Sequence, residues 1–333
     1  YSNVDPDEAL RKAAEDCEIK ISQFQTDVYQ NPKLYQQIKK IKIADPIEAK
    51  FREDILEGFE KTGIQLSADK QARLKAIFDE LAKIEQEYAR NVRDNPEKLE
   101  FSPDELKGLP QSYIDGLKKN DKGNYLLGFE YPDYRPFMEL ADNDEARKRY
   151  QIAFTRRGGE KNLALLKQAM DLRYELAQLF GKSSYAEWVL QSRMAKNPET
   201  VNKFLAEVHA TVAPLEKKEV QTLREFKAQS LNIPVEQASI ERWSEAYWSE
   251  KLRKAKYQVD QEQLRQYFPT QASQDWLFAM SENLYGIKFK PAKVEVWQDE
   301  VEYYDVTDAK TGQLLGGLYM DKFPREGKYG HAA

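Results

Sequence analysis

Apolar residues recur at spacings of three and four along most of this chain, which is the period of an amphipathic α-helix. One such stripe opens the sequence, and a second follows Ser67, a residue type typical of helix N-caps. Asn95-Pro96 predicts the end of the second helix, because the residue before proline disfavours helical geometry. The stripes comprise Ala9, Ala13, Cys17, Ile21, Phe24 and Val28, then Leu74, Ile77, Phe78, Leu81, Ile84 and Tyr88.

Prolines and turn residues interrupt the helical period between residues 101 and 136. Gly108-Leu109-Pro110 and the run from Tyr131 to Pro136 indicate loops, whereas residues 124–129 have the composition of a short strand. We interpret this region as a connection between two helical layers and not as a flexible linker between domains.

Helices are predicted to resume at Asp142. Asn197-Pro198 is a strong start signal, since a capping residue precedes a proline in the first turn. Gly181 is typical of a helix C-cap, and Pro214 predicts a kink or division in the helix that contains it. Two apolar faces are expected here, formed by Leu163, Leu166, Met170, Tyr174 and Ala177, and by Val201, Leu205, Val208, Val212 and Leu215.

The pattern changes near residue 286 from helical periodicity to alternation rich in β-formers. Residues 294–297 and 301–306 are predicted strands, and Asp308 to Gly312 is a hairpin loop before a strand over 313–320. The sequence therefore predicts a mainly α fold, a multi-helical body with a small antiparallel β-sheet near the C-terminal end. We divide it into a helical body, 1–285, and a β-hairpin region, 286–333.

Composition excludes several classes of protein. The chain has 333 residues, of which 41% are hydrophobic and 32% charged, with a formal net charge of -5. Its basic residues are not clustered, so no nucleic-acid partner is expected, and no apolar stretch approaches the roughly 20 residues of a membrane helix. No signal peptide is visible, and one cysteine, Cys17, fits a reducing, cytoplasmic location. Its place on the first stripe predicts a small core residue.

Residues that carry chemistry are scarce. The two histidines, His209 and His331, are far apart, and neither belongs to an H-E-x-x-H motif. We expect His209 to be a partly buried helix residue, and the aromatic pairs at 247–248 and 303–304 to serve packing. The motifs predict no catalytic residue and no metal ligand within the chain.

Several stretches together have a specific pattern. The most specific stretch is Tyr319-Met320-Asp321 followed by Pro324-Arg325-Glu326-Gly327-Lys328-Tyr329-Gly330-His331-Ala332-Ala333. The supporting stretches are Leu106 to Pro110, Tyr131-Pro132-x-Tyr134, Met194-Ala195-Lys196, Tyr257 to Asp260, Tyr267-Phe268-Pro269 and Val296-Trp297-x-Asp299-x-Val301. This pattern resembles the thimet oligopeptidase, neurolysin and oligopeptidase A family of zinc metallopeptidases over essentially the whole chain. Lys322-Phe323 and residues 244–248 depart from the family's usual pattern.

The resemblance implies an enzyme that hydrolyses internal bonds of short peptides. It also implies that the zinc motif and a third, glutamate ligand fall after Ala333, so that the zinc cofactor belongs to the full-length parent and none is bound by this chain. The chain is then an inactive internal fragment. Residues 1–285 would form part of a channel wall, and 286–333 would begin the catalytic domain.

The resemblance further implies an extended substrate beside an edge strand, with affinity from backbone hydrogen bonds. We expect Gly330, His331, Ala332 and Ala333 to form part of that substrate-binding edge, because small residues let another backbone approach; a tight turn with a buried strand is the alternative. Short peptides are the expected partners of a monomer. Arg325-Glu326 is expected to orient the segment by ion pairing. Two other functions stay open, a noncatalytic helical peptide-binding or interaction protein and a related peptidyl-dipeptidase.

Overall fold

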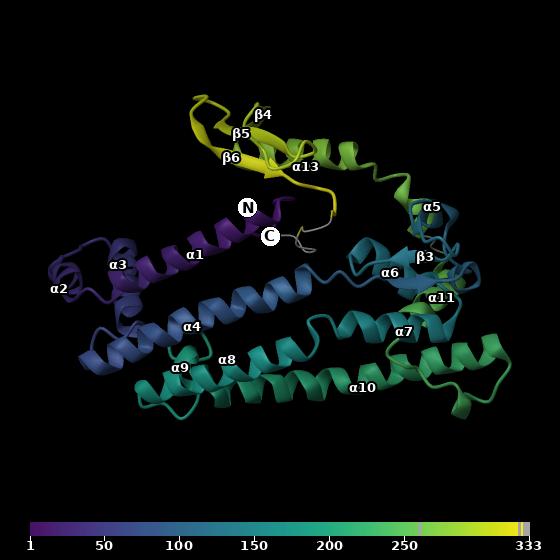
Figure 1. The fold of residues 1–333 in the computed structure, drawn as a ribbon, viewed down its shortest axis with the longest axis horizontal. Helices are drawn as coiled ribbons and strands as arrows, with labels where there is room; N and C mark the ends of the chain where they lie inside the picture. Colours follow the sequence, from purple (N-terminus) through teal and green to yellow (C-terminus); the bar gives the residue numbers. More distant parts are fainter. Residues whose placement is uncertain (259–260, 326–327, 329–333) are drawn as a thin grey trace.

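The computed structural model describes residues 1–258, 261–325 and 328. Its long helices run side by side, a group of short helices and strands lies at the right of Figure 1, and a separate small sheet is drawn above the long helices. The helices are α1 (Glu8–Tyr29), α2 (Pro32–Lys40), α3 (Pro46–Lys61), α4 (Ala68–Arg93), α5 (Gln111–Asp115), α6 (Tyr131–Leu140), α7 (Asp144–Thr155), α8 (Gly159–Leu179), α9 (Tyr185–Leu190), α10 (Pro198–Leu231), α11 (Glu245–Tyr257), α12 (Gln261–Arg265) and α13 (Thr270–Tyr285). The strands are β1 (Leu99–Phe101), β2 (Lys118–Lys119), β3 (Tyr125–Leu127), β4 (Ile287–Pro291), β5 (Glu302–Asp308) and β6 (Leu314–Met320).

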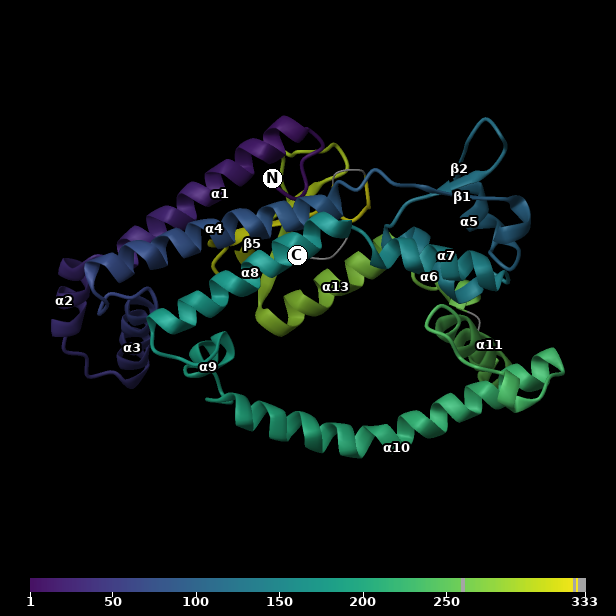
Figure 2. The same ribbon diagram turned by 60° about the horizontal axis from the view of Figure 1, so that its bottom comes forward.

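Helices α1, α4 and α8 form a long-helix lobe (Figures 1 and 2). Ser67 is the N-cap of α4, and α4 ends at Arg93, so both predicted boundaries of this helix are confirmed. The core lies between α4 and α8, where apolar side chains of both helices are buried against each other. Its buried members are Leu74, Ile77, Leu81 and Ile84 of α4 and Leu165, Ala169, Leu172 and Leu176 of α8.

The predicted inward stripe of α1 is wrong, although the helix itself is confirmed. The buried face of α1 is polar, and Glu15 accepts hydrogen bonds from Arg90 at 2.9 Å and Arg93 at 3.2 Å on α4. Cys17 is exposed, and so are Ile21 and Phe24. The ion pairs turn the opposite side of α1 toward α4, because a charged group is buried only where it finds a partner.

Two further expected faces are also exposed. On α8 the stripe that includes Leu163, Met170 and Tyr174 faces outward, since the helix has a second apolar stripe that meets α4. Helix α10 begins at Pro198 as predicted, with Asn197 accepting from the Thr200 amide at 2.8 Å. Its apolar face is exposed as well, and His209 is exposed, contrary to the expected partial burial. Helix α10 continues through Pro214 without division and is bowed (Figure 2).

Residues 99–157 fold into a compact aromatic lobe, which corrects the prediction of a simple connection between helical layers. Strands β1, β3 and β2 form an antiparallel sheet in that order, so the predicted strand near residue 125 is confirmed. The run from Tyr131 to Pro136 is helical, because Pro132 lies in the first turn of α6, where a missing amide costs nothing. The core is Phe101, Leu106, Leu109, Leu127, Phe129, Phe137, Met138, Ala141, Ala146 and Tyr150.

Tyr247 and Trp248 on α11 are buried beside Leu223 of α10, which confirms their expected packing role. The C-terminal sheet has the antiparallel order β4-β5-β6. The predicted hairpin between β5 and β6 is confirmed, with Asp308 accepting from the Thr311 amide at 2.7 Å in the loop. The predicted strand over residues 294–297 is wrong, because β4 pairs with β5 just before it.

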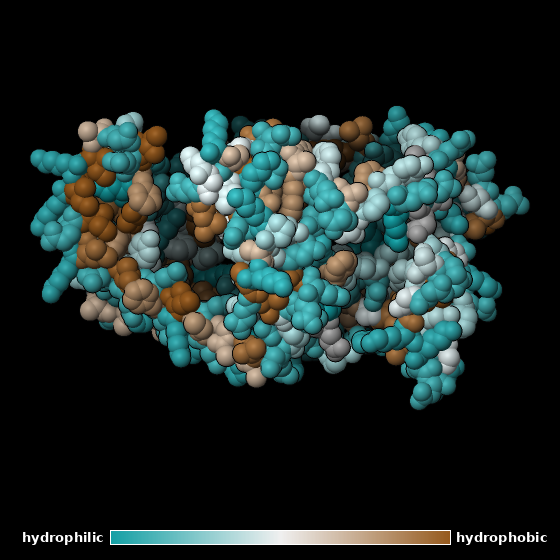
Figure 3. Space-filling model, turned by 90° about the horizontal axis from the view of Figure 1, so that it is seen from above, coloured by the Kyte–Doolittle hydropathy of each residue, from teal (hydrophilic) through white to brown (hydrophobic). Residues whose placement is uncertain are grey.

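Apolar side chains gather on the surface where α2 and α3 lie, at the left of Figure 3. They include Ile47, which is 80% exposed, and Phe51, which is 67% exposed. Within the described part of the chain, none of the helices combines the length and apolar character that crossing a membrane requires.

Candidate functional site

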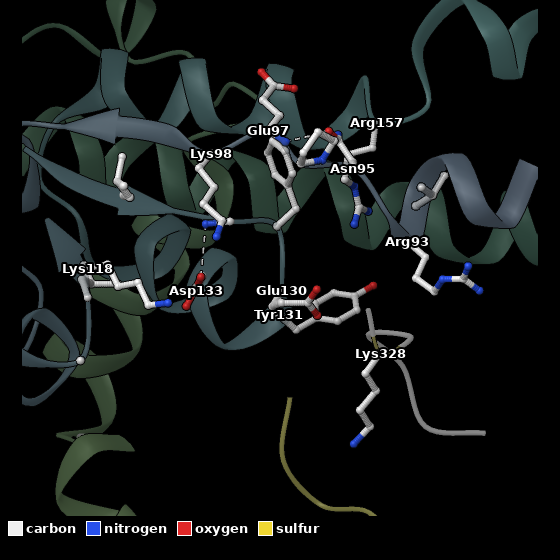
Figure 4. Close-up of a pocket in the computed structure, with 17 residues that line it drawn as sticks. Arg93, Asn95, Glu97, Lys98, Lys118, Glu130, Tyr131, Asp133, Arg157 and Lys328 are labelled. Atoms are coloured by element: carbon white, nitrogen blue, oxygen red, sulfur yellow. Dashed lines mark hydrogen bonds between the residues drawn. The ribbon is translucent and has the colours of Figure 1, made fainter. Parts of the chain in front are cut away.

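A cavity of about 400 Å³ lies where the long-helix lobe meets the aromatic lobe, and we call it the junction pocket. Its wall comes from the end of α4, the linker to β1, the start of β2, the end of β3 and the start of α6. Figure 4 shows Lys98, Lys118 and Asp133 on one side, Arg93, Arg157 and Lys328 on the other, and Glu130 and Tyr131 between them. The pocket thus combines charges of both signs with the apolar side chains of Leu117, Leu126 and Phe129.

One buried tyrosine and one partly buried tyrosine hold the segment that carries Glu130. The Tyr150 hydroxyl donates to the carbonyl of Gly128, and the Tyr113 hydroxyl donates to the carbonyl of Asp133. Burial raises the pKa of both phenols, so they stay protonated and act as donors. A hydrogen bond within the segment also stabilises it: the Gly128 amide donates to the Asp133 carboxylate at 3.3 Å. The aromatic core therefore fixes this wall of the pocket.

The carboxyl groups in the pocket have perturbed pKa values. Burial raises the pKa of Glu130, and nearby Asp133 adds to that effect, whereas Arg157 and Lys328 oppose it. Burial also raises the pKa of Asp133, whereas the hydrogen bond from the Gly128 amide and the charge of Lys98 lower it. Burial lowers the pKa of Arg157. Perturbed titratable groups in a pocket are characteristic of functional sites.

A second cluster fixes the chain between β6 and the pocket, and we call it the Asp321 clamp. The Arg325 guanidinium donates to both oxygens of Asp321, at 2.7 and 2.9 Å, and Trp297 Nε1 donates at 2.9 Å. Lys328 donates to Asp321 at 3.0 Å and lines the pocket. Arg325 also donates to the carbonyl of Val4, which ties the start of the chain to this segment.

The predicted substrate-binding residues Gly330, His331, Ala332 and Ala333 lie outside the described residues, as does Glu326. Arg325 forms an ion pair with Asp321, and the orienting role expected of Arg325-Glu326 stays a prediction. The described residues contain no group of three or more His, Cys, Asp or Glu side chains that could hold a metal ion.

Sequence reasoning missed the charged residues of the junction pocket. Lys98, Lys118, Glu130, Asp133 and Arg157 come from separate stretches of chain, and none belongs to a catalytic motif. The nearest signal is the stretch that begins at Tyr131, which matched the family pattern without indicating a cavity.

Comparison with known proteins places this geometry in context. The model of peptidase family M3 matches residues 137–333, which is more than half of the chain. The chain belongs to peptidase family M3. Thimet-like oligopeptidase of Dictyostelium discoideum is 29% identical over 100% of this chain and 52% of its own length. Oligopeptidase A of Escherichia coli is 31% identical over 97% of this chain and 50% of its own length. Saccharolysin of Saccharomyces cerevisiae is 28% identical over 99% of this chain and 50% of its own length. This M3 chain thus spans about half the length of the curated relatives it matches.

The Asp321 clamp gives the M3 chain a specific acid sensitivity. Burial would raise the pKa of Asp321, but the bonds from Arg325, Trp297 and Lys328 lower it to about 2. Because this pKa lies below the ordinary value of about 3.9, the carboxylate stabilises the fold above about pH 4, and the contribution is lost as the pH falls through about 2. Asp321→Asn is expected to lower the free energy of unfolding by about 2 kcal/mol at pH 7.

Urea unfolding at pH 7 and at acid pH measures this effect. Asp299→Asn is the matched control, since Asp299 is exposed on the same connecting segment as Trp297. Equal losses of stability in the two variants at pH 7 would show that the clamp contributes nothing.

Proposed function

We propose that this chain is one part of a zinc-dependent oligopeptidase that hydrolyses internal bonds of short peptides, and that its own role is to bind and position the peptide. The observation that carries the proposal is the family match over residues 137–333, a range that includes Trp297, Asp321, Arg325 and Lys328 of the Asp321 clamp. Two of these relatives are named as oligopeptidases, which supports short peptides as substrates.

Zinc does not fit the described residues. Cys17 and His209 are exposed on different helices, and no cluster of ligating side chains surrounds either of them in the described ranges. In an M3 peptidase, zinc supplies a Lewis acid and an activated water. On the family resemblance, we propose that the zinc ligands and the hydrolytic step belong to residues outside this chain.

Strand β6 offers a backbone edge for an extended peptide. It pairs with β5 on one side and is the last strand in the sheet order of the described residues. An extended peptide that adds to such an edge gains main-chain hydrogen bonds with little demand on its side chains. Gly330, His331, Ala332 and Ala333 would continue this substrate-facing edge, and the Asp321 clamp would fix the direction in which the chain leaves β6.

Residues 1–285 would supply one wall of a substrate channel, and residues 286–333 would begin the catalytic domain. The exposed apolar faces of α8 and α10 support this division, because large exposed apolar patches mark surfaces that other protein covers. The share of each relative that the chain spans, about half, leaves enough polypeptide in a full-length homologue to cover them.

The proposal is tested by asking whether the purified chain binds a short peptide and leaves it intact. Binding without cleavage is expected, since the described residues hold a pocket large enough for part of a peptide and a strand edge, but no metal cluster.

A further inference from the structure

Three cations of the junction pocket have no acidic partner within salt-bridge distance among the residues that the structure describes. They are Lys98, Lys118 and Arg157. The other two cations are already engaged, Arg93 with Glu15 and Asp94, and Lys328 with Asp321. Three carboxyl groups of the lining, those of Glu97, Glu130 and Asp133, also form no salt bridge within the described residues, so the unpaired charges of the pocket are of both signs.

Arg157 is pre-organised for an anion. Its Nε donates to the carbonyl of Phe154 at 2.9 Å, and its guanidinium lies 3.8 Å from the centroid of the Phe154 ring. The side chain is half-buried, and its two terminal nitrogens make no further hydrogen bond within the described residues. A guanidinium fixed by stacking loses little freedom when it forms a bidentate pair with a carboxylate.

The pocket is of the right size and character for part of a peptide. Its volume of about 400 Å³ falls within the range of roughly 300–1,000 Å³ that small-ligand sites occupy. Phe129 and the half-exposed Tyr131 give it an apolar surface beside the charged groups. Glu130 and Asp133 line the same pocket, and burial raises the pKa of both carboxyl groups.

We propose that the junction pocket binds a carboxylate of the peptide, with Arg157 as its direct partner and with Lys98 and Lys118 adding attraction. The inference rests on the proposed function, since it names the part of the substrate that this chain recognises. The carboxylate can come from the C-terminus of the peptide or from an acidic side chain, and the two sources share the same chemistry. The carboxylate anchor would place one end or one acidic residue of the peptide in the pocket that Lys328 also lines.

Isothermal titration calorimetry of the 333-residue chain tests the proposal with three unlabelled nonapeptides. One has a free C-terminal carboxylate and no Asp or Glu, the second is its amide, and the third is the amide with one Glu near the end. The free acid is expected to bind about tenfold more tightly than the plain amide, as one charge-assisted bond allows. If the third peptide recovers that affinity, the pocket accepts a side-chain carboxylate as well; if it does not, the chain terminus is the ligand.

Arg157→Gln is expected to reduce the ratio of acid to amide affinity to about one. Arg156→Gln is the matched control, since Arg156 is exposed next to it and lies outside the pocket. Lys118→Gln changes an exposed residue, so it is not expected to disturb folding. It should lower the ratio of acid to amide affinity two- to threefold, because one exposed charge contributes roughly that much to binding. Its control is Lys119→Gln, which alters the neighbouring lysine outside the pocket.

Equal affinity of the acid and the amide for the unaltered chain would overturn the carboxylate site and leave the proposed peptide-binding function intact. An unchanged ratio of acid to amide affinity in Arg157→Gln would also overturn the carboxylate site. Failure of all three peptides to bind would instead contradict the proposed function itself, and the carboxylate site with it.

Discussion

Replacing Gly108 by alanine is expected to destabilise the aromatic lobe by roughly 2–5 kcal/mol, the combined cost of left-handed strain and overpacking. Gly108 has a φ of +94°, and a Cβ there would lie 2.2 Å from the carbonyl oxygen of Leu140. That oxygen belongs to the backbone at the end of α6, which cannot move without disturbing the core. The Asp142 amide also donates to the Lys107 carbonyl at 2.8 Å, so the two backbones are held together at this point.

Gly123→Ala is the control that separates strain from collision. Gly123 has a φ of +80°, but no atom lies within 4 Å of the position of its Cβ. Its replacement is therefore expected to cost only the conformational strain, roughly 1–2 kcal/mol. Urea unfolding followed by tryptophan fluorescence measures both, since Trp243 packs against the aromatic core. Equal costs for the two variants would mean that the close approach at Gly108 is not a constraint on the fold.

Loss of the Arg147 side chain is expected to destabilise the fold about as much as Gly108→Ala. This guanidinium is 1% exposed, and it donates to the carbonyls of Ala141 and Trp243 and, at 2.6 Å, to Asp144. It also lies 4.1 Å from the centroid of the Tyr247 ring. Arg147→Met should lower the free energy of unfolding by roughly 3–5 kcal/mol, because two carbonyls and one carboxylate lose their buried donor.

Differential scanning calorimetry of Arg147→Met, Arg147→Lys and a surface control tests this expectation. Lysine keeps the charge but cannot span three acceptors, so Arg147→Lys should fall between the unaltered chain and Arg147→Met. Arg135→Ala is the control, since Arg135 pairs with Glu139 on an exposed turn of α6 and should change stability by less than about 1 kcal/mol. A melting temperature for Arg147→Met that matches Arg135→Ala would contradict a structural role for the buried guanidinium.

Local signals predicted the helix boundaries well, because capping is decided by neighbouring residues. Asn197 caps α10 with its own side chain, and Gly181 follows α8 with a φ of +69°. The inward face of α1 could not be predicted in this way. Its orientation depends on Glu15 meeting Arg90 and Arg93, which are 75 and 78 positions away. A periodic stripe shows that a helix has an apolar side, but the partner decides which side is covered.

The site was less accessible to sequence reasoning than the fold. The family pattern identified the C-terminal segment, and the structure adds the Asp321 clamp that holds it. The junction pocket has no sequence signature, because Lys98, Lys118 and Arg157 come to line one pocket only when the chain is folded. Arg157 becomes distinctive through its ring contact with Phe154, a feature of geometry that spacing alone does not predict.

The central claim is that this chain binds peptide and that hydrolysis requires residues outside it. The most direct measurement combines calorimetric binding of a short quenched peptide with a fluorescence assay of its cleavage, using the purified 333-residue chain with and without added zinc. Mass spectrometry of the peptide after incubation and activity across a gel-filtration profile identify any cleavage that belongs to the chain. The account predicts saturable binding and an intact peptide at every zinc concentration. Zinc-dependent cleavage that co-elutes with the chain and stops on addition of a chelator would contradict it.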